Sequence, residues 1–299
     1  VHAGECLAVI GGSGSGKSTL TRIMLGLESA DSGSVEYESQ SIVGGRKSPG
    51  FATLRRESGL VFQDPFSSLD PRWQVAKSVA EPLSLQRRDL NNTDIDERVA
   101  AALTMAGLEP ADFLNRYPID LSGGQAQRVV IARAIINEPK VILADEPMSA
   151  IDVAARIQIL DTFAAIRAAR PSTAIIMVSH DLGVVQHIAD RILVMRAGAF
   201  VMEGAPADLL EAARGKVWEA EVSAGEAEAL AARLAVANAH YREGGRSLVR
   251  YVADEPAVPG SVPASPTLED LYLYVFRDEA APPSTAAPTR AARKGGRHA

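Results

Sequence analysis

The stretch GGSGSGKST, from Gly11 to Thr19, decides the fold. It satisfies the pattern G-x-x-x-x-G-K-[ST], in which glycines let consecutive backbone N–H groups point at phosphate oxygens without obstruction by side chains. The apolar run ECLAVI before it predicts a buried parallel strand, and STLTRIMLGL after it has apolar residues at helical spacing. Because a phosphate loop requires this passage from strand to helix, we expect a phosphate site here.

Every residue of this loop is expected to contact a nucleotide. These residues are Gly11, Gly12, Ser13, Gly14, Ser15, Gly16, Lys17, Ser18 and Thr19. Lys17 would reach the β- and γ-phosphates as a point charge, and the Ser18 hydroxyl would ligate Mg²⁺. The alternative is a glycine-rich turn without a ligand, which the flanking strand and helix disfavour. The expected cofactors are ATP and Mg²⁺.

Two acids follow a second predicted strand in VILADE. Asp145, at the carboxyl end of that strand, is placed to hold Mg²⁺ through water. Glu146 lies one step further out, where its carboxylate can accept a proton from water as a general base. A pair of acids that merely faces solvent is the alternative. Beside Lys17, however, the pair predicts hydrolysis of the nucleotide rather than passive binding.

Two further residues end apolar runs and are expected at the same edge of the sheet. His180 closes AIIMVSH, and its imidazole could hydrogen-bond a γ-phosphate oxygen and help to fix the attacking water. Gln63 follows GLVF and is a neutral amide that can ligate Mg²⁺. A structural histidine and an uninvolved glutamine are the alternatives. The predicted catalytic residues are therefore Glu146, His180 and Gln63, and the predicted metal ligands are Ser18, Gln63 and Asp145.

A second cradle for an anion lies in LSGGQAQRVV, from Leu121 to Val130, where a serine and two glycines precede a helical pattern. The expected nucleotide contacts here are Ser122, Gly123, Gly124 and Gln125. The helical stretch before this cradle is expected to project as a lobe, so the cradle would serve a neighbouring molecule. Two copies about a two-fold axis would then hold each ATP between the Lys17 loop of one chain and the Ser122 cap of the other.

Strands and helices alternate along most of the chain, which predicts an α/β fold with a mostly parallel sheet covered on both faces. SVEYESQ and GLVFQD are expected to be short strands, and the mostly helical stretch from Val75 to Leu108 indicates a helical insert over about residues 67–127. RILVMRAGAFVMEG predicts a hairpin that turns at Ala197 and Gly198. The core domain is expected to cover residues 1–214.

A small α+β appendage is expected over residues 215–278. It would contain a strand at KVWEAEV, a helix from Gly225 to His240, a strand at SLVRYVA and a closing helix at TLEDLYLYVF. The last stretch, residues 279–299, is rich in Pro, Ala and basic residues without aromatic residues, and it predicts a disordered tail.

Composition excludes several classes of protein. The 299 residues include 46% hydrophobic and 23% charged residues, as in a folded globular chain. No apolar run approaches the ~18 residues that a bilayer crossing needs, and no signal segment opens the chain. The net charge of −6 disfavours a nucleic-acid surface. Cys6, the single cysteine, lies in an apolar run, so we expect a buried thiol and no internal disulfide.

From the phosphate loop to about Arg214, the sequence resembles the ATP-binding subunit of ABC transporters. The matching motifs are GGSGSGKST (Walker A), VFQD with Gln63 (Q-loop), LSGGQ (signature), VILADE (Walker B), SAID ending at Asp152 (D-loop) and SH with His180 (H-loop). The resemblance implies that Asp152 contributes to nucleotide binding and that ATP closes a dimer which hydrolysis reopens. It thus implies a P-loop NTPase core whose ATP hydrolysis is coupled to a permease.

The resemblance also implies partners and a location. The partners would be ABC permease membrane subunits, a second ATP-binding subunit in a homodimer or heterodimer, and an extracellular substrate-binding protein; no nucleic acid is expected. The chain would lie in the cytoplasm, on the inner face of the cell membrane through the permease. VFQDPFSSLDPRWQVAKSVAEPL and DEPMSAIDV look like the branch that imports dipeptides, oligopeptides and nickel.

The two ends of the sequence depart from that branch. The family's opening strands and its adenine-stacking aromatic residue are expected to be missing from the N-terminus. The stretch from KVWEAEV to TLEDLYLYVF resembles instead the C-terminal extension of drug-export, ABC-2-type ATPases. Three alternatives to peptide or nickel import stay open: a drug-export ATPase, an ABC-type ATPase that works without a membrane, and a regulatory nucleotide switch.

Overall fold

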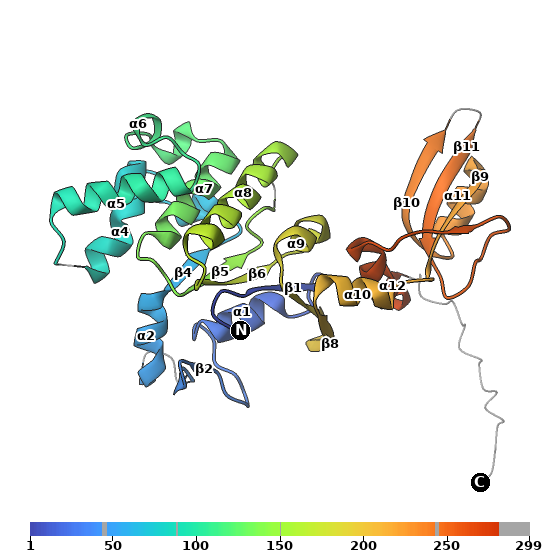
Figure 1. The fold of residues 1–299 in the computed structure, drawn as a ribbon, viewed down its shortest axis with the longest axis horizontal. Coiled ribbons are helices and arrows are strands. Elements are labelled where there is room, and N and C mark those ends of the chain that lie inside the picture. The colour runs from blue at the N-terminus through green and yellow to red at the C-terminus, as the bar shows by residue number, and fades with distance from the viewer. Residues whose placement is uncertain (44–46, 88, 150, 243–244, 281–299) are drawn as a thin grey trace, which may run out of the picture. The chain divides into compact units, whose positions relative to one another are not determined.

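The computed structural model of the chain describes residues 1–43, 47–87, 89–149, 151–242 and 245–280 (Figure 1). Its internal contacts form two compact units, residues 1–209 and residues 210 onward. This division lies close to the boundary at Arg214 that the sequence predicts. No helix in these ranges combines the length and the apolar character that a bilayer crossing requires.

The first unit is built on a six-stranded sheet in the order β4-β5-β6-β1-β7-β8. Its strands are β1 Cys6–Gly11, β4 Ser58–Val61, β5 Val141–Asp145, β6 Ala174–Val178, β7 Arg191–Arg196 and β8 Ala199–Gly204. The first five run parallel, and β8 pairs antiparallel with β7 in the predicted hairpin. β1 and β6 are buried along their whole length, as their continuous apolar runs predict. The α/β fold is confirmed.

Helices cover this sheet and extend beyond it. The helices of the unit are α1 Lys17–Met24, α2 Pro49–Glu57, α3 Pro65–Ser68, α4 Val75–Gln86, α5 Asn92–Met105, α6 Pro110–Phe113, the 3₁₀ helix Pro118–Asp120, α7 Gly123–Ile135, α8 Val153–Ala169, α9 Leu182–Ile188 and α10 Pro206–Ala212. In Figure 1, α4, α5 and α6 lie beyond α7, on the side away from β8. One hydrophobic core joins Leu83 and Leu103 of this group to Ile131 of α7 and Ile142 of β5. The helical insert is therefore packed onto the sheet through α7.

The stretch SVEYESQ is not the single strand that the sequence predicts. It forms a hairpin of two short strands, β2 Glu36–Tyr37 and β3 Gln40–Ser41. Glu38 and Ser39 connect them with φ of 48° and 62°, in the left-handed region. This left-handed backbone ends the first strand at Tyr37 and turns the chain back, although Val35 and Tyr37 alternate with polar residues as in a longer strand.

The described part of the second unit is built on an antiparallel sheet in the order β10-β11-β9-β12, with helices α11 and α12. Its elements are β9 Val217–Ser223, α11 Ala224–Ala231, β10 Ala235–Arg242, β11 Arg246–Val252, β12 Val262–Pro263 and α12 Leu268–Ala280. The core contains Ala220, Val222, Ala227, Val249 and Tyr251. Within the buried end of α12, the Asp270 carboxylate accepts hydrogen bonds from Arg250 and Thr267. The tail predicted for residues 279–299 lies, from residue 281 on, outside the described residues.

The prediction of a helix from Gly225 to His240 is wrong for the second half of this stretch. α11 ends at Ala231, and Ala235–Arg242 is the strand β10, which pairs antiparallel with β11. The alanines of this stretch favour a helix locally, but Val236 and Tyr241 are strand formers and β11 offers a complete row of partners. Pairing along the whole strand outweighs the local helix propensity.

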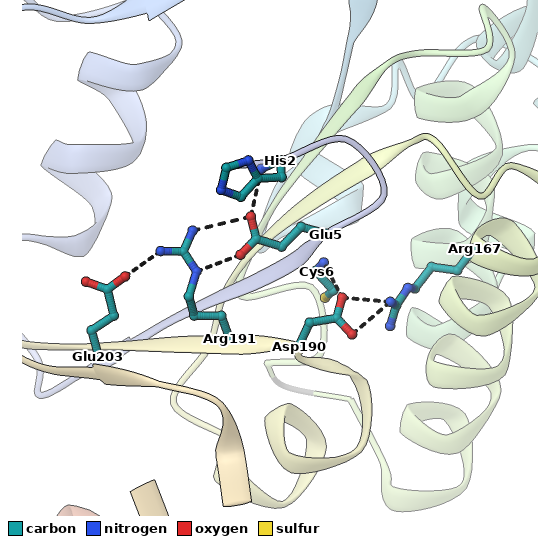
Figure 2. A network of polar contacts seen from close by, with 7 residues as sticks. All are labelled: His2, Glu5, Cys6, Arg167, Asp190, Arg191 and Glu203. Atoms are coloured by element: carbon teal, nitrogen blue, oxygen red, sulfur yellow. Dashed lines mark hydrogen bonds and ion pairs between the residues drawn. The ribbon is translucent and has the colours of Figure 1, made fainter. Parts of the chain in front are cut away.

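Two ion-pair clusters tie the start of β1 to neighbouring elements (Figure 2). Arg191 of β7 donates to Glu5 at 2.6 and 3.3 Å and also pairs with Glu203 of β8. Next to them, Asp190 accepts hydrogen bonds from the Cys6 backbone N–H at 2.8 Å and from Arg167 of α8. These contacts join three strands and a helix. Cys6 itself is buried, as expected, and burial raises the pKa of its thiol to about 12.

The Glu5 carboxylate makes the stability of this unit sensitive to acid. Hydrogen bonds from Arg191 hold the pKa of Glu5 below its ordinary value of 4.5. Its stabilising contribution is therefore complete above pH 4.5 and is lost as the pH falls through the lowered pKa. We expect Glu5→Gln to reduce the free energy of unfolding at pH 7 by about 1 kcal/mol.

Urea denaturation at pH 7 and at pH 3.5 would measure this contribution. The difference between wild type and Glu5→Gln should shrink at the lower pH. Glu203→Gln is the matched control, because Glu203 pairs with the same arginine but is 53% exposed, and its effect should be smaller. A Glu5→Gln effect that stays constant over this pH range would contradict the assignment.

Candidate functional site

The phosphate loop connects β1 to α1 as the sequence predicts. Gly16 forms the N-cap of α1 with φ of 101°, and Gly14 has φ of 75°. Residues with a side chain rarely adopt these left-handed backbone angles, so glycine is favoured at both positions. The turn between β7 and β8 is bonded to this loop, because the Gly198 N–H donates to the Ser15 carbonyl at 2.9 Å. The backbone N–H groups at the start of α1 are therefore held in a fixed turn.

Lys17 lies inside this turn. Its side chain Nζ donates to the carbonyls of Gly11 at 2.7 Å and Gly12 at 2.9 Å, and the residue is only 7% exposed. Burial lowers the pKa of Lys17, while the negative charges of Glu146 and Asp145 act against that shift. The ammonium is thus held in the loop and is within electrostatic reach of both acids of the VILADE motif.

The other loop residues range from exposed to buried. Ser13, Gly14, Ser18 and Thr19 are exposed, Gly12 and Gly16 are half-buried, and Gly11 and Ser15 are buried. A Cβ atom on Gly11 would lie 2.3 Å from the Met195 carbonyl oxygen, so this glycine is required by the close approach of β7. The Ser15 hydroxyl is buried and has no hydrogen-bond partner among the described residues. A buried polar group without a partner in this turn fits a site that holds a polar ligand.

Glu146 is the centre of the candidate catalytic group. It follows β5 with φ of 47°, a left-handed conformation that is costly for a glutamate, and its N–H donates to the Val178 carbonyl of β6 at 2.8 Å. One carboxylate oxygen lies 3.3 Å from Nδ1 of His180, and the other accepts a hydrogen bond from Gln63 at 3.3 Å. The structure therefore brings Gln63, Glu146 and His180 together from the ends of three strands.

Asp145 lies at the end of β5 with a half-buried side chain. Burial and the neighbouring charge of Glu146 raise its pKa, while Lys17 and Arg22 act in the opposite direction. With Gln63 it lines a hollow of about 490 Å³, together with Phe62, Asp64, Ser67, Ser68 and Arg133. Carboxylate and amide oxygens are hard donors of the kind that Mg²⁺ prefers, so these residues fit that ion.

The second predicted anion site, Ser122 to Gln125, lies at the N-terminus of α7 and forms a capping box. The Ser122 hydroxyl accepts from the Gln125 N–H at 3.3 Å, and the Gln125 side chain accepts from the Ser122 N–H at 3.0 Å. A Cβ atom on Gly123 would meet nothing within 4 Å, whereas one on Gly124 would lie 2.5 Å from the Cβ atom of Ala155. Gly123 therefore faces open space, and Gly124 is required by the packing of α7 on α8.

The chain is similar to known proteins over about two thirds of its length. The family model described as ABC transporter matches residues 1–149. The oligopeptide transport ATP-binding protein OppF of Salmonella typhimurium is 41% identical over 204 residues, which are 68% of this chain and 60% of that protein. The di/tripeptide transport ATP-binding protein DppF of Pseudomonas aeruginosa is 41% identical over 210 residues, which are 70% of this chain and 64% of that protein.

Solved structures agree with this likeness. The protein cbiO1 from Clostridium perfringens, part of the ABC transporter complex cbiONQ, superposes with a TM-score of 0.63 at 31% identity, over 70% of this chain and 80% of that one. The ATP-binding cassette MJ0796, a dimer bound to ADP and Pi, has a TM-score of 0.61 at 31% identity, over 69% and 87%. The chain belongs to the ABC transporter ATP-binding family. It spans about 60% of the length of the OppF relatives that it matches.

Family membership explains the order of the motifs, and the structure adds contacts around them. Asp152 of the D-loop caps α8, because its carboxylate accepts from the Ala155 N–H at 2.9 Å. Arg156, on the first turn of α8, also contacts this region and is not among the residues that the sequence predicts for the site. Its guanidinium donates to the Ile151 carbonyl and to Asp181, the residue after His180, at 2.9 Å each. The signal available in the sequence was an arginine four residues after the helix cap.

Proposed function

We propose that this ABC-family chain is an ATP-hydrolysing subunit that drives a membrane transporter. The observation that carries the proposal is the position of Glu146, whose carboxylate lies 3.3 Å from both the Gln63 amide and the His180 imidazole. The buried ammonium of Lys17 lies within electrostatic reach of the same carboxylate. A base, a neutral hydrogen-bond partner and a phosphate-binding cation thus meet in one site.

The residues of this site divide the work of hydrolysis. Lys17 and the loop N–H groups would bind the β- and γ-phosphates, and Glu146 would accept a proton from the attacking water. His180 would hydrogen-bond an oxygen of the γ-phosphate and orient that water. Ser18, Gln63 and Asp145 would hold Mg²⁺, which when bound neutralises phosphate charge.

The second cradle is proposed to act in trans. Ser122, Gly123, Gly124 and Gln125 would contact the nucleotide of a second ATP-binding subunit, with Asp152 beside them. The open space in front of Gly123 supports this role, because a ligand can approach the helix N-terminus there. The similar cassette MJ0796 is described as dimeric. A two-fold pair with two composite sites is therefore the assembly that we propose.

Peptides are the proposed cargo class. Relatives about 40% identical are named as oligopeptide and di/tripeptide transport ATP-binding proteins, and another, from Pectobacterium atrosepticum, as a glutathione import ATP-binding protein. The proposed partners are permease subunits in the membrane and an extracellular substrate-binding protein, with the chain on the inner face of the membrane. The likeness of the second unit to drug-export ATPases stays a prediction.

Binding of MgATP through Lys17 tests the first step. We expect Lys17→Met to raise the Kd for MgATP by about tenfold or more, because a charge-assisted contact to phosphate is lost. Titration of the purified chain with a fluorescent ATP analogue would measure it. Lys140→Met is the matched control, since Lys140 pairs with Glu38 and Glu57 away from the loop. Equal Kd values for Lys17→Met and wild type would reject this nucleotide site.

A further inference from the structure

Arg156 connects two segments that flank the candidate site. From the first turn of α8, its Nε donates to the carbonyl of Ile151 at 2.9 Å, and its Nη1 donates to the carboxylate of Asp181 at 2.9 Å. Ile151 directly precedes Asp152, and Asp181 directly follows His180. A single planar guanidinium therefore holds the D-loop segment and the His180 segment at once.

The His180 segment is held firmly on its other side. Ser179 is 4% exposed, and its N–H donates to the Val9 carbonyl of β1 at 3.2 Å. The Ser179 hydroxyl accepts from the Asp181 N–H at 3.0 Å. The residue after His180 is thus bonded through its backbone N–H to Ser179 and through its carboxylate to Arg156, so Arg156 contributes to placing the backbone that carries His180.

We propose that Arg156 is a positioning residue, which transmits the placement of the Asp152 segment to His180 and thereby to Glu146. This inference rests on the proposed function, in which Asp152 lies beside the second subunit. Contact with that subunit would set the D-loop segment, and Arg156 would carry the change across to His180. Each composite site would then become fully ordered only when the dimer is closed.

The alternative is that Arg156 forms an ordinary surface ion pair. Its side chain is 37% exposed and that of Asp181 is 25% exposed, so the pair alone adds little to stability. Arg167, on the same helix, makes the same kind of contacts: it donates to the Ile188 carbonyl at 2.8 Å and to Asp190 at 2.7 Å. Arg167 lies in the cluster of Figure 2, among residues to which no catalytic role is assigned. It is therefore a matched control.

Steady-state phosphate release from MgATP by the full chain tests the proposal. We expect Arg156→Ala to lower kcat about tenfold with KM changed by less than about twofold, because His180 is misplaced while the phosphate loop is intact. Arg156→Lys should recover kcat only in part, since an ammonium lacks the planar fork. Arg167→Ala should keep the wild-type kcat.

A double-variant cycle shows whether Arg156 acts through His180. Arg156→Ala combined with His180→Ala should be no slower than His180→Ala alone. If the double variant is slower by the full factor of the single Arg156→Ala change, or if Arg156→Ala keeps the wild-type kcat, the proposal is overturned. Should Arg156→Ala unfold, Asp181→Asn removes the same ion pair, and its kcat, alone and combined with His180→Ala, decides the proposal in the same way. Absence of turnover in the wild type would instead remove the proposed function.

Discussion

Glu146→Gln is expected to lower kcat for MgATP hydrolysis by about 100-fold or more. A glutamine side chain has nearly the shape of glutamate but cannot accept the proton of the attacking water. The Glu146 carboxylate lies 3.3 Å from both the Gln63 amide and the His180 imidazole, so it is placed between the two side chains proposed to orient the water. The neighbouring Asp145 is turned to the hollow with Gln63 and is assigned to the metal ion.

Phosphate release and nucleotide binding should be measured on the same preparation. MgATP binding should persist in Glu146→Gln, because Lys17 and the loop are unchanged. Glu138→Gln is the matched control: Glu138 also has a left-handed φ, of 53°, and pairs with an arginine, Arg170, but lies outside the site. Equal rates in wild type and Glu146→Gln would reject hydrolysis by this site.

The conformation of Glu146 helps to explain why the proposed base is well placed. A residue with φ of 47° is held there only if the surrounding contacts over-determine it. The N–H bond to Val178 and the bond from the Ser149 N–H to the Glu146 carbonyl supply such contacts. The backbone of Glu146 is therefore held at the strand end before any nucleotide binds, and the carboxylate is placed by its contacts with Gln63 and His180.

The sequence predicted the sheet and the meeting of the motifs because both follow from local patterns. Continuous apolar runs indicate buried parallel strands, and the carboxyl ends of such strands share one edge. This rule was enough to place Gln63, Glu146 and His180 together. The cap formed by Ser122 and Gln125 was also readable, because serine followed by glutamine three residues later is the pattern of a capping box.

Features that depend on distant partners could not be read in this way. The strand β10 exists because β11 pairs with it, and its alanine-rich sequence alone favours a helix. The contact between Arg156 and Asp181 joins two residues that are 25 positions apart in the sequence. Arg156 lies on α8 and Asp181 follows β6, and no sequence pattern indicates that these two segments meet. The need for Gly124 comes from Ala155 on another helix. In each case tertiary packing, rather than spacing, decides the role of the residue.

A mixture of two inactive variants is expected to regain hydrolysis if the composite site forms in trans. Gly123→Glu should lower turnover by about 100-fold or more, because a carboxylate at the helix N-terminus repels the triphosphate. The substitution should leave the fold intact, since a side chain at Gly123 has open space before it. Lys17→Met disables the other half of the site. Each variant alone carries one damaged half in every site.

When the two variants are mixed, half of randomly formed dimers contain one chain of each kind. Every mixed dimer has one site with both an intact Lys17 loop and an intact Gly123 cap, so about one quarter of wild-type turnover should return. Mixing Lys17→Met with Glu146→Gln is the control, because both changes damage the same half and neither composite site is restored. If the mixture of Lys17→Met and Gly123→Glu stays as inactive as its components, the nucleotide is not shared between two copies of this chain. If turnover returns in this mixture but not in the control mixture, Lys17 and Gly123 must act from opposite subunits.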